Sequence, residues 1–161
     1  MSTKPEQRAV TLRAATSAGL VEGTLHVARL HLLLDAINHG HDFVTLTDVR
    51  VRDANERVPF FALRRSETLA VVVPAGEDPD DRKQRPSLVD HEVTCLLPSG
   101  AVRGRVALVK DVRLSDWLAG QRGFIVMRES RLWLGANGLS EDQAAVVLVN
   151  SQRVVGVTEL G

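Results

Sequence analysis

The sequence repeats its own pattern after 81 residues, and this internal repeat restricts the possible folds more than any other feature. Without a gap, Gly19 matches Gly100 and Gly23 matches Gly104. Further identical residues follow in the same order, at Leu33/Leu114, Asp35/Asp116, Phe43/Phe124 and Arg50/Arg131. After residue 51 the second copy needs about four extra residues, which places Ser66 on Ser151. Self-similarity at a fixed period indicates a structural unit that is used twice.

Each copy predicts the same order of secondary structure. Residues 10–28 alternate between apolar and polar on both sides of a turn, which predicts a β-hairpin. The apolar residues that come next have the spacing of an amphipathic helix, which Gly40 is placed to end: Leu30, Leu33, Leu34 and Ile37. Strands are expected at 43–51 and 124–134, and a last hairpin closes each copy.

The fold is therefore expected to be mainly β (β-rich α+β), with two tandem β-β-α-β-β-β repeats. Each repeat would form a small barrel-like or strongly bent antiparallel sheet with one short helix. Because one copy is small for an independent core, we expect the copies to pack against each other. The expected organisation is a flexible tail at 1–7, a first repeat at 8–73, a charged Pro-containing linker at 74–91 and a second repeat at 92–161.

Composition argues against several classes of protein. The formal net charge is zero, so binding of nucleic acid is not expected, and no apolar run is long enough to insert into a membrane. One cysteine excludes an internal disulfide and fits a reducing compartment. Arginine outnumbers lysine 17 to 3, which suggests a GC-rich bacterial genome. We expect a cytoplasmic bacterial protein.

Gly19, Gly23, Leu25 and the strand Leu46-Thr47-Asp48-Val49 follow the order strand, turn with Gly, strand with Gly, then L-x-D-V. This order resembles the Sm-like small β-barrel family. That family has its helix before the first strand, and its RNA-binding loops have no match here. The resemblance implies a small barrel, with binding of nucleic acid or a nucleotide as an alternative function. The duplicated pattern is also similar to small β-rich bacterial domains of unknown function, which implies no activity.

The first predicted helix carries the main candidate for metal chemistry. His31, Asp35 and His39 are spaced at i, i+4 and i+8, so they would share one helical face and provide weak candidate ligands. The second copy has Val112, Asp116 and Gly120 there, which favours a solvated surface instead. No metal or cofactor is expected.

Two other groups of reactive side chains have structural interpretations. Asp35 recurs as Asp116. A structural role near the start of each helix explains this recurrence better than a catalytic pair of carboxylates does. Cys95 lies in an alternating strand, where a small core residue is more common than a nucleophile. We therefore assign no catalytic residues.

Leu32 and Trp117 lie off the apolar faces of their predicted helices. Because burial of such side chains stabilises by roughly 1.5–3 kcal/mol, both are expected to contact something outside their own sheets. That contact is the other repeat, a second chain in a homodimer, or a protein partner.

Recognised nucleotide-binding, hydrolase and redox motifs do not occur in the sequence. The leading hypothesis is therefore a non-enzymatic interaction or regulatory protein, an adaptor whose duplicated β-rich domains bind an unknown protein partner. A Sm-like nucleic-acid or nucleotide binder is the alternative. Metal-dependent activity at the His-rich first helix is the second alternative.

Overall fold

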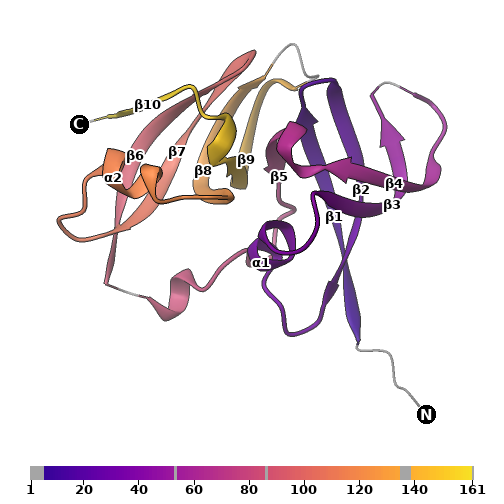
Figure 1. The fold of residues 1–161 in the computed structure, drawn as a ribbon, viewed down its shortest axis with the longest axis horizontal. Helices are drawn as coiled ribbons and strands as arrows, with labels where there is room; N and C mark the ends of the chain where they lie inside the picture. Colours follow the sequence, from indigo (N-terminus) through magenta and orange to yellow (C-terminus); the bar gives the residue numbers. More distant parts are fainter. Residues whose placement is uncertain (1–5, 53, 86, 135–138, 161) are drawn as a thin grey trace.

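The computed structural model describes residues 6–52, 54–85, 87–134 and 139–160. These residues form ten β-strands and two short α-helices, so the chain is mainly β, as the alternating pattern predicts (Figure 1). Both α-helices have six residues, and no described helix is long and apolar enough to cross a membrane.

Each half of the chain contributes five strands and one α-helix. The first half contains β1 (Gln7–Thr16), β2 (Gly19–Ala28), α1 (Leu33–Asn38), β3 (Phe43–Val51), β4 (Val58–Arg64) and β5 (Thr68–Val72). The second half contains β6 (Leu88–Leu97), β7 (Gly100–Val109), α2 (Leu114–Ala119), β8 (Phe124–Leu134), β9 (Leu139–Asn150) and β10 (Gly156–Glu159). Short 3-10 helices precede β5 (η1, Arg65–Glu67), β6 (η2, Arg82–Gln84) and β10 (η4, Ser151–Arg153). The strands predicted at 43–51 and 124–134 are confirmed with those bounds.

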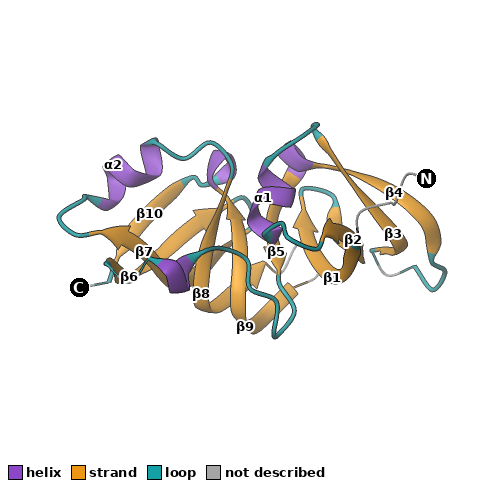
Figure 2. Ribbon diagram, turned by 90° about the horizontal axis from the view of Figure 1, so that it is seen from below, coloured by secondary structure: helices purple, strands orange, loops and turns teal. Residues whose placement is uncertain are grey.

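All ten strands belong to one antiparallel sheet, in the order β10-β6-β7-β8-β9-β5-β1-β2-β3-β4. The sheet is open, because β10 and β4 are its two ends. The two halves lie side by side, with both α-helices toward one side (Figure 2). Two separate sheets were expected; the halves instead join because β5 pairs with β9, and we call this pair the seam.

The order of strands is the same in the two halves: β5-β1-β2-β3-β4 and β10-β6-β7-β8-β9. The first hairpin pairs Thr16 with Gly19, and the second pairs Leu97 with Gly100, at the 81-residue offset. In the last hairpins the offset is 86, because Phe43 pairs with Arg64 whereas Phe124 pairs with Asn150. The alignment of Ser66 with Ser151 is therefore wrong by one residue. Uniform runs of Val and Leu do not specify a register by themselves.

Gly23 and Gly104 allow the second strand of each half to cross closely over the third. A Cβ atom on Gly23 would lie 2.7 Å from Val49 Cγ2, and one on Gly104 would lie 2.6 Å from Ser130 Oγ. The pairing register shifts at both glycines. Such shifts mark bulges that bend a strand and increase its twist. The recurrent glycines therefore bend the sheet at equivalent places in the two halves.

Two hydrophobic clusters share the seam. Val71 and Leu148 belong to the cluster that fills the first half, whereas Ala70 and Val149 belong to the cluster that fills the second. Side chains alternate between the faces of a sheet, so the seam is covered on both faces. Phe124 of β8 also packs into the first-half cluster. Each half therefore completes the core of the other.

The predicted linker packs against both halves. Glu77 pairs with Arg8 at 2.7 Å, Asp80 pairs with Arg128 of β8, and the Pro79 carbonyl accepts a hydrogen bond from Leu34 N at 2.9 Å. The dense charge of this segment thus makes specific ion pairs. β6 begins at Leu88, so the strand includes the last four residues of the segment 74–91. The predicted tail 1–7 lies mostly outside the described residues, and Gln7 begins β1.

Candidate functional site

The structure separates the three weak metal candidates. α1 begins at Leu33, so His31 lies in the preceding turn, where its N–H bonds to the Ala28 carbonyl at 2.9 Å. Asp35 is inside the helix and His39 is its C-cap, with 3.8 Å between His39 Nε2 and Asp35 Oδ1. The expectation that all three share one helical face is wrong. Across the described residues, no group of three His, Cys, Asp or Glu side chains could hold a metal ion.

The recurrent aspartates lie in the first turns of two separate helices. Asp35 belongs to α1 and Asp116 to α2, and both are exposed. A carboxylate in the first turn of a helix interacts favourably with the helix dipole. The two carboxylates thus occupy equivalent positions in separate helices and do not form a pair.

Cys95 is buried in the core of the second half. It lies in β6 between β7 and β10, opposite Val102 and Val157. Burial raises the pKa of its thiol from 9.0 to about 11, so the thiol stays protonated at neutral pH. A nucleophilic cysteine requires the opposite shift.

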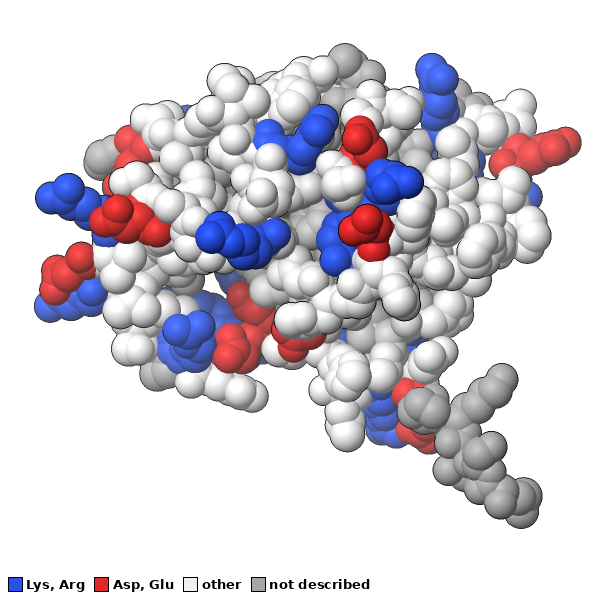
Figure 3. Space-filling model, in the orientation of Figure 1, with Lys and Arg blue, Asp and Glu red and all other residues white. Residues whose placement is uncertain are grey.

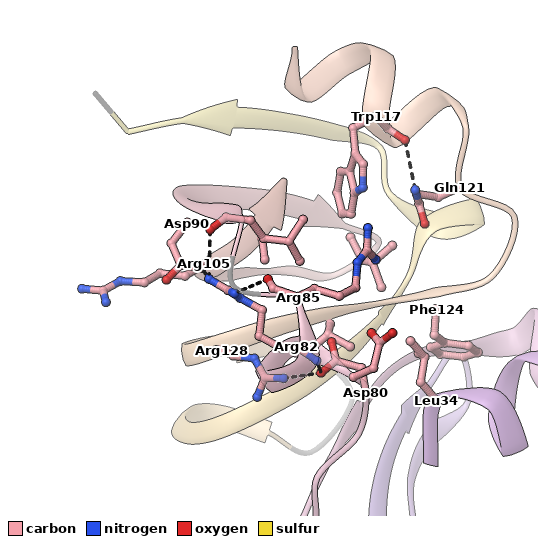
Figure 4. A pocket seen from close by; sticks show the side chains of 15 residues that line it. Leu34, Asp80, Arg82, Arg85, Asp90, Arg105, Trp117, Gln121, Phe124 and Arg128 are labelled. Atoms are coloured by element: carbon pink, nitrogen blue, oxygen red, sulfur yellow. Dashed lines mark hydrogen bonds and ion pairs between the residues drawn. The ribbon is translucent and has the colours of Figure 1, made fainter. Parts of the chain in front are cut away.

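A cleft of about 230 Å³ lies between α2, the η2 segment and the strands β7 and β8 (Figure 4). Trp117, the partner-contact candidate on α2, forms one wall, and it is half-buried against the second-half core. Leu34 of α1 and Phe124 line the end nearer the first half. The cleft is therefore a polar and apolar hollow at the boundary of the two halves.

Four arginines and three aspartates also line this cleft, and most of their charges pair within it. Arg128 pairs with Asp80, and Arg82 Nη2 lies 3.7 Å from Asp90 Oδ1. Arg85 has no ion-pair partner among the described residues, and its side chain extends toward Trp117 and Gln121 (Figure 4). Elsewhere, charges of both signs are interspersed on the face shown in Figure 3. Arg105 pairs with Glu129 at 3.1 Å, so Arg85 and Asp81 are the lining charges without an ion-pair partner among the described residues.

Two amide side chains bond across the boundary of the two halves: Asn38 is half-buried and Asn150 is buried. Asn38 of α1 accepts a hydrogen bond from Phe124 N at 2.6 Å and donates one to Phe124 O at 3.1 Å. Asn150 of β9 donates from Nδ2 to Thr68 O at 2.9 Å. These amides satisfy backbone groups that the strand ladder leaves unpaired.

Apolar side chains are exposed at both ends of the sheet. Near β4, Phe43 and Phe60 are 43% and 60% exposed. Near β10, Leu96 and Val155 are 52% and 68% exposed. Leu32, the other partner-contact candidate, is half-buried at the N-cap of α1. An unpaired edge strand that carries exposed apolar side chains is a site where another polypeptide can add a strand to the sheet.

Sequence reasoning missed these ends because it did not assign which strand lies at the edge. A signal was present nevertheless. Phe43 begins the alternating strand 43–51 and Phe60 lies within the next strand, whereas the β9 run Val146–Val149 is continuously apolar. A continuous apolar run indicates a strand that is covered on both faces.

No protein-family model, curated protein sequence or solved structure matches this chain.

Proposed function

We propose that this chain is a non-enzymatic interaction protein of the bacterial cytosol, an adaptor that binds proteins through the two free ends of its sheet. The observation that carries this proposal is the exposure of Phe43, Phe60, Leu96 and Val155 beside unpaired strands. A free strand binds another polypeptide through its backbone, and flanking apolar side chains add affinity. Leu32 and Trp117 keep some exposed surface and are proposed as further contacts.

The proposal includes a duplicated architecture. We regard the halves as two copies of one β-β-α-β-β-β module, each a strongly bent, Sm-like small barrel. The shared strand order, the matched hairpins and the paired glycine bends support this interpretation. Duplication of a module whose edge strand pairs with a neighbour leaves one free edge at each end.

The test compares the intact chain with an edge variant. Phe60→Asp places a charge on an exposed β4 side chain, so it should weaken partner binding without unfolding the monomer. Val109→Asp is the matched control, because Val109 is also exposed but lies at the end of β7, an internal strand. Proteins cross-linked to the chain in lysate are identified, purified and titrated against the three forms. The proposal predicts that only Phe60→Asp loses affinity; equal affinities would contradict it.

A second candidate is a small anionic ligand, such as a nucleotide, in the cleft beside Trp117. The specific observation is the Arg85 side chain, which lines the cleft, has no carboxylate partner among the described residues and extends toward Trp117. A guanidinium and an aromatic ring can together bind a phosphate and a base. Titration with ATP and inorganic phosphate should quench tryptophan fluorescence, and Arg85→Ala should abolish the quenching. An unchanged signal in the wild-type chain would exclude this candidate.

A further inference from the structure

The two free ends of the sheet correspond to the two strands that pair at the seam. At the 86-residue offset, β4 corresponds to the second part of β9, and β10 corresponds to β5. We infer that β10 of one chain pairs with β4 of a second copy, in the geometry of the seam. This inference rests on the proposed function, in which the free edges bind protein, and it names the partner.

Backbone groups on β10 are available for such a pair. Leu160 N donates to Glu92 O at 2.8 Å, so Leu160 and its alternate neighbours face β6. Residues of an antiparallel strand face its two neighbours in alternation. Val157 and Glu159 therefore direct their backbone N–H and C=O groups away from β6, toward the free edge.

The same alternation identifies the free groups of β4. Arg65 N donates to Asp42 O at 2.6 Å, and this bond continues the ladder between β3 and β4. Phe60 and Ala62 lie an odd number of residues before Arg65, so their backbone groups point the opposite way and face the free edge.

The residues whose backbone groups are free on β10 and β4 correspond to the residues that form backbone hydrogen bonds at the seam. At the seam, Val73 N donates to Val146 O at 3.1 Å. The counterpart of Val73 is Glu159, and the counterpart of Val146 is Phe60, both 86 residues away. If β10 of one chain pairs with β4 of a second copy in the register of the seam, the free backbone groups of Val157 and Glu159 face those of Ala62 and Phe60. This register places Gly156, Val157, Thr158 and Glu159 opposite Leu63, Ala62, Phe61 and Phe60, respectively.

Side chains near β4 also correspond to residues that the seam buries. Phe124 and Val146 of the second half are buried in the first-half core. Their counterparts Phe43 and Phe60 are exposed on the β3–β4 edge. A second copy in the seam geometry would cover both rings.

The β10 edge shows the complementary relationship. Ala15 and Leu69 of the first half are fully buried in the second-half core. Their counterparts Leu96 and Val155 are among the exposed apolar side chains. The two edges therefore expose complementary surfaces, and copies would add head to tail, because each contact uses two different surfaces.

The contact between copies should be weaker than the seam. Ala119 stands at the position of Asn38, so the amide that holds Phe124 has no equivalent at the outer edge. Arg64 stands at the position of Asn150 and stacks on Phe43, with its guanidinium carbon 4.4 Å from the ring centroid. The Arg64 guanidinium keeps N–H groups that can donate hydrogen bonds to the backbone of the second copy. Assembly should therefore depend on protein concentration.

The experiment uses two single variants and their mixture. Phe60→Asp blocks the β4 edge, and Val155→Asp blocks the β10 edge; both side chains are exposed, so each monomer should fold. Val109→Asp is the control, and circular dichroism verifies the fold of each variant. Mass is measured by light scattering during size-exclusion chromatography, in a dilution series that extends into the micromolar range.

We expect the wild type and Val109→Asp to form oligomers that dissociate on dilution. Each edge variant should bind its own copies about tenfold or more weakly, because it buries an unpaired charge. Mixing the two variants should give a one-to-one dimer, since one intact edge remains on each chain. A wild type that stays monomeric, a single variant that still forms wild-type oligomers, or a mixture without the dimer would overturn the inference.

The same variants separate this inference from the proposed function. If the wild type is monomeric but a purified partner loses affinity for Phe60→Asp, the edge binds a different protein and only the inference fails. If the chain is monomeric and no such partner is obtained, both fail.

Discussion

Asn38 and Phe124 form a two-hydrogen-bond clamp between α1 and the first residue of β8, across the boundary of the two halves. The Asn38 amide satisfies both the N–H and the C=O group of Phe124, whose side chain is buried in the first-half core. This clamp ties a helix of one half to a strand of the other.

Asn38→Ala should lower the free energy of unfolding by about 1–3 kcal/mol, because it leaves two backbone groups without partners. His39→Ala, at the exposed neighbouring position, is the control and should have little effect. Urea unfolding measures both. Equal stability of Asn38→Ala and the wild type would contradict the role of the clamp.

Gly123→Ala should couple to the same clamp. A Cβ at Gly123 would lie 2.4 Å from Asn38 Oδ1, closer than atoms can approach, so Asn38 would have to move. Gly123→Ala should therefore destabilise the wild type more than it destabilises Asn38→Ala. A double-mutant cycle in urea measures this coupling, and additive effects would show that the two residues act independently.

Ser130→Ala should leave stability unchanged or raise it by up to about 1 kcal/mol. The Ser130 hydroxyl is buried and has no hydrogen-bond partner among the described residues. Thr16→Val is the matched control: the Thr16 hydroxyl donates to Gly19 O at 2.7 Å, so its loss should destabilise. Thermal unfolding compares the two, and a large loss for Ser130→Ala would reveal an unrecognised partner of that hydroxyl.

Cys95 should make stability depend on alkaline pH. Burial raises the pKa of its thiol from 9.0 to about 11, so the folded chain keeps a proton that the unfolded chain loses. The resulting stabilisation is complete below pH 9.0 and is lost as the pH rises toward about 11. The stability difference between wild type and Cys95→Ala should therefore shrink across this range in urea unfolding. A constant difference would contradict the assignment.

Zinc should not bind at a one-to-one ratio with high affinity. Asp35 and His39 are exposed, and His31 lies outside the helix, so at most two of these side chains approach each other. Two ligands are fewer than a stable zinc site uses. Calorimetric titration of the untagged chain, with His39→Ala as control, measures the affinity. Tight stoichiometric binding that His39→Ala abolishes would support metal-dependent activity instead.

The sequence predicts the strands better than the helices. Phe43–Val51 and Phe124–Leu134 alternate clearly, and the structure confirms both bounds. The helix prediction included Leu30, which is 94% exposed and lies in the turn before α1. A helix of six residues obtains most of its stability from packing, so the spacing of leucines alone cannot define its start.

The seam could be predicted only in part. The continuous apolar runs at Leu69–Val73 and Val146–Val149 indicate strands buried on both faces. Their pairing with each other depends on which strands the sheet leaves at its edges, and this depends on the whole topology. The cleft was beyond sequence reasoning for a similar reason, because Arg85 and Trp117 approach only after the linker folds back.

The exchange of core residues across the seam affects how the chain folds during synthesis. When the first half leaves the ribosome, its core still lacks Phe124 and Leu148, which are translated much later. The nascent first half therefore exposes an incomplete core and the unpaired edge of β5 until β9 is made. Because domains generally fold as units, we expect stable folding after translation of β9 and not halfway through. Ribosome-bound chains that stop before residue 124 should remain sensitive to protease, whereas those that extend beyond β9 should become resistant.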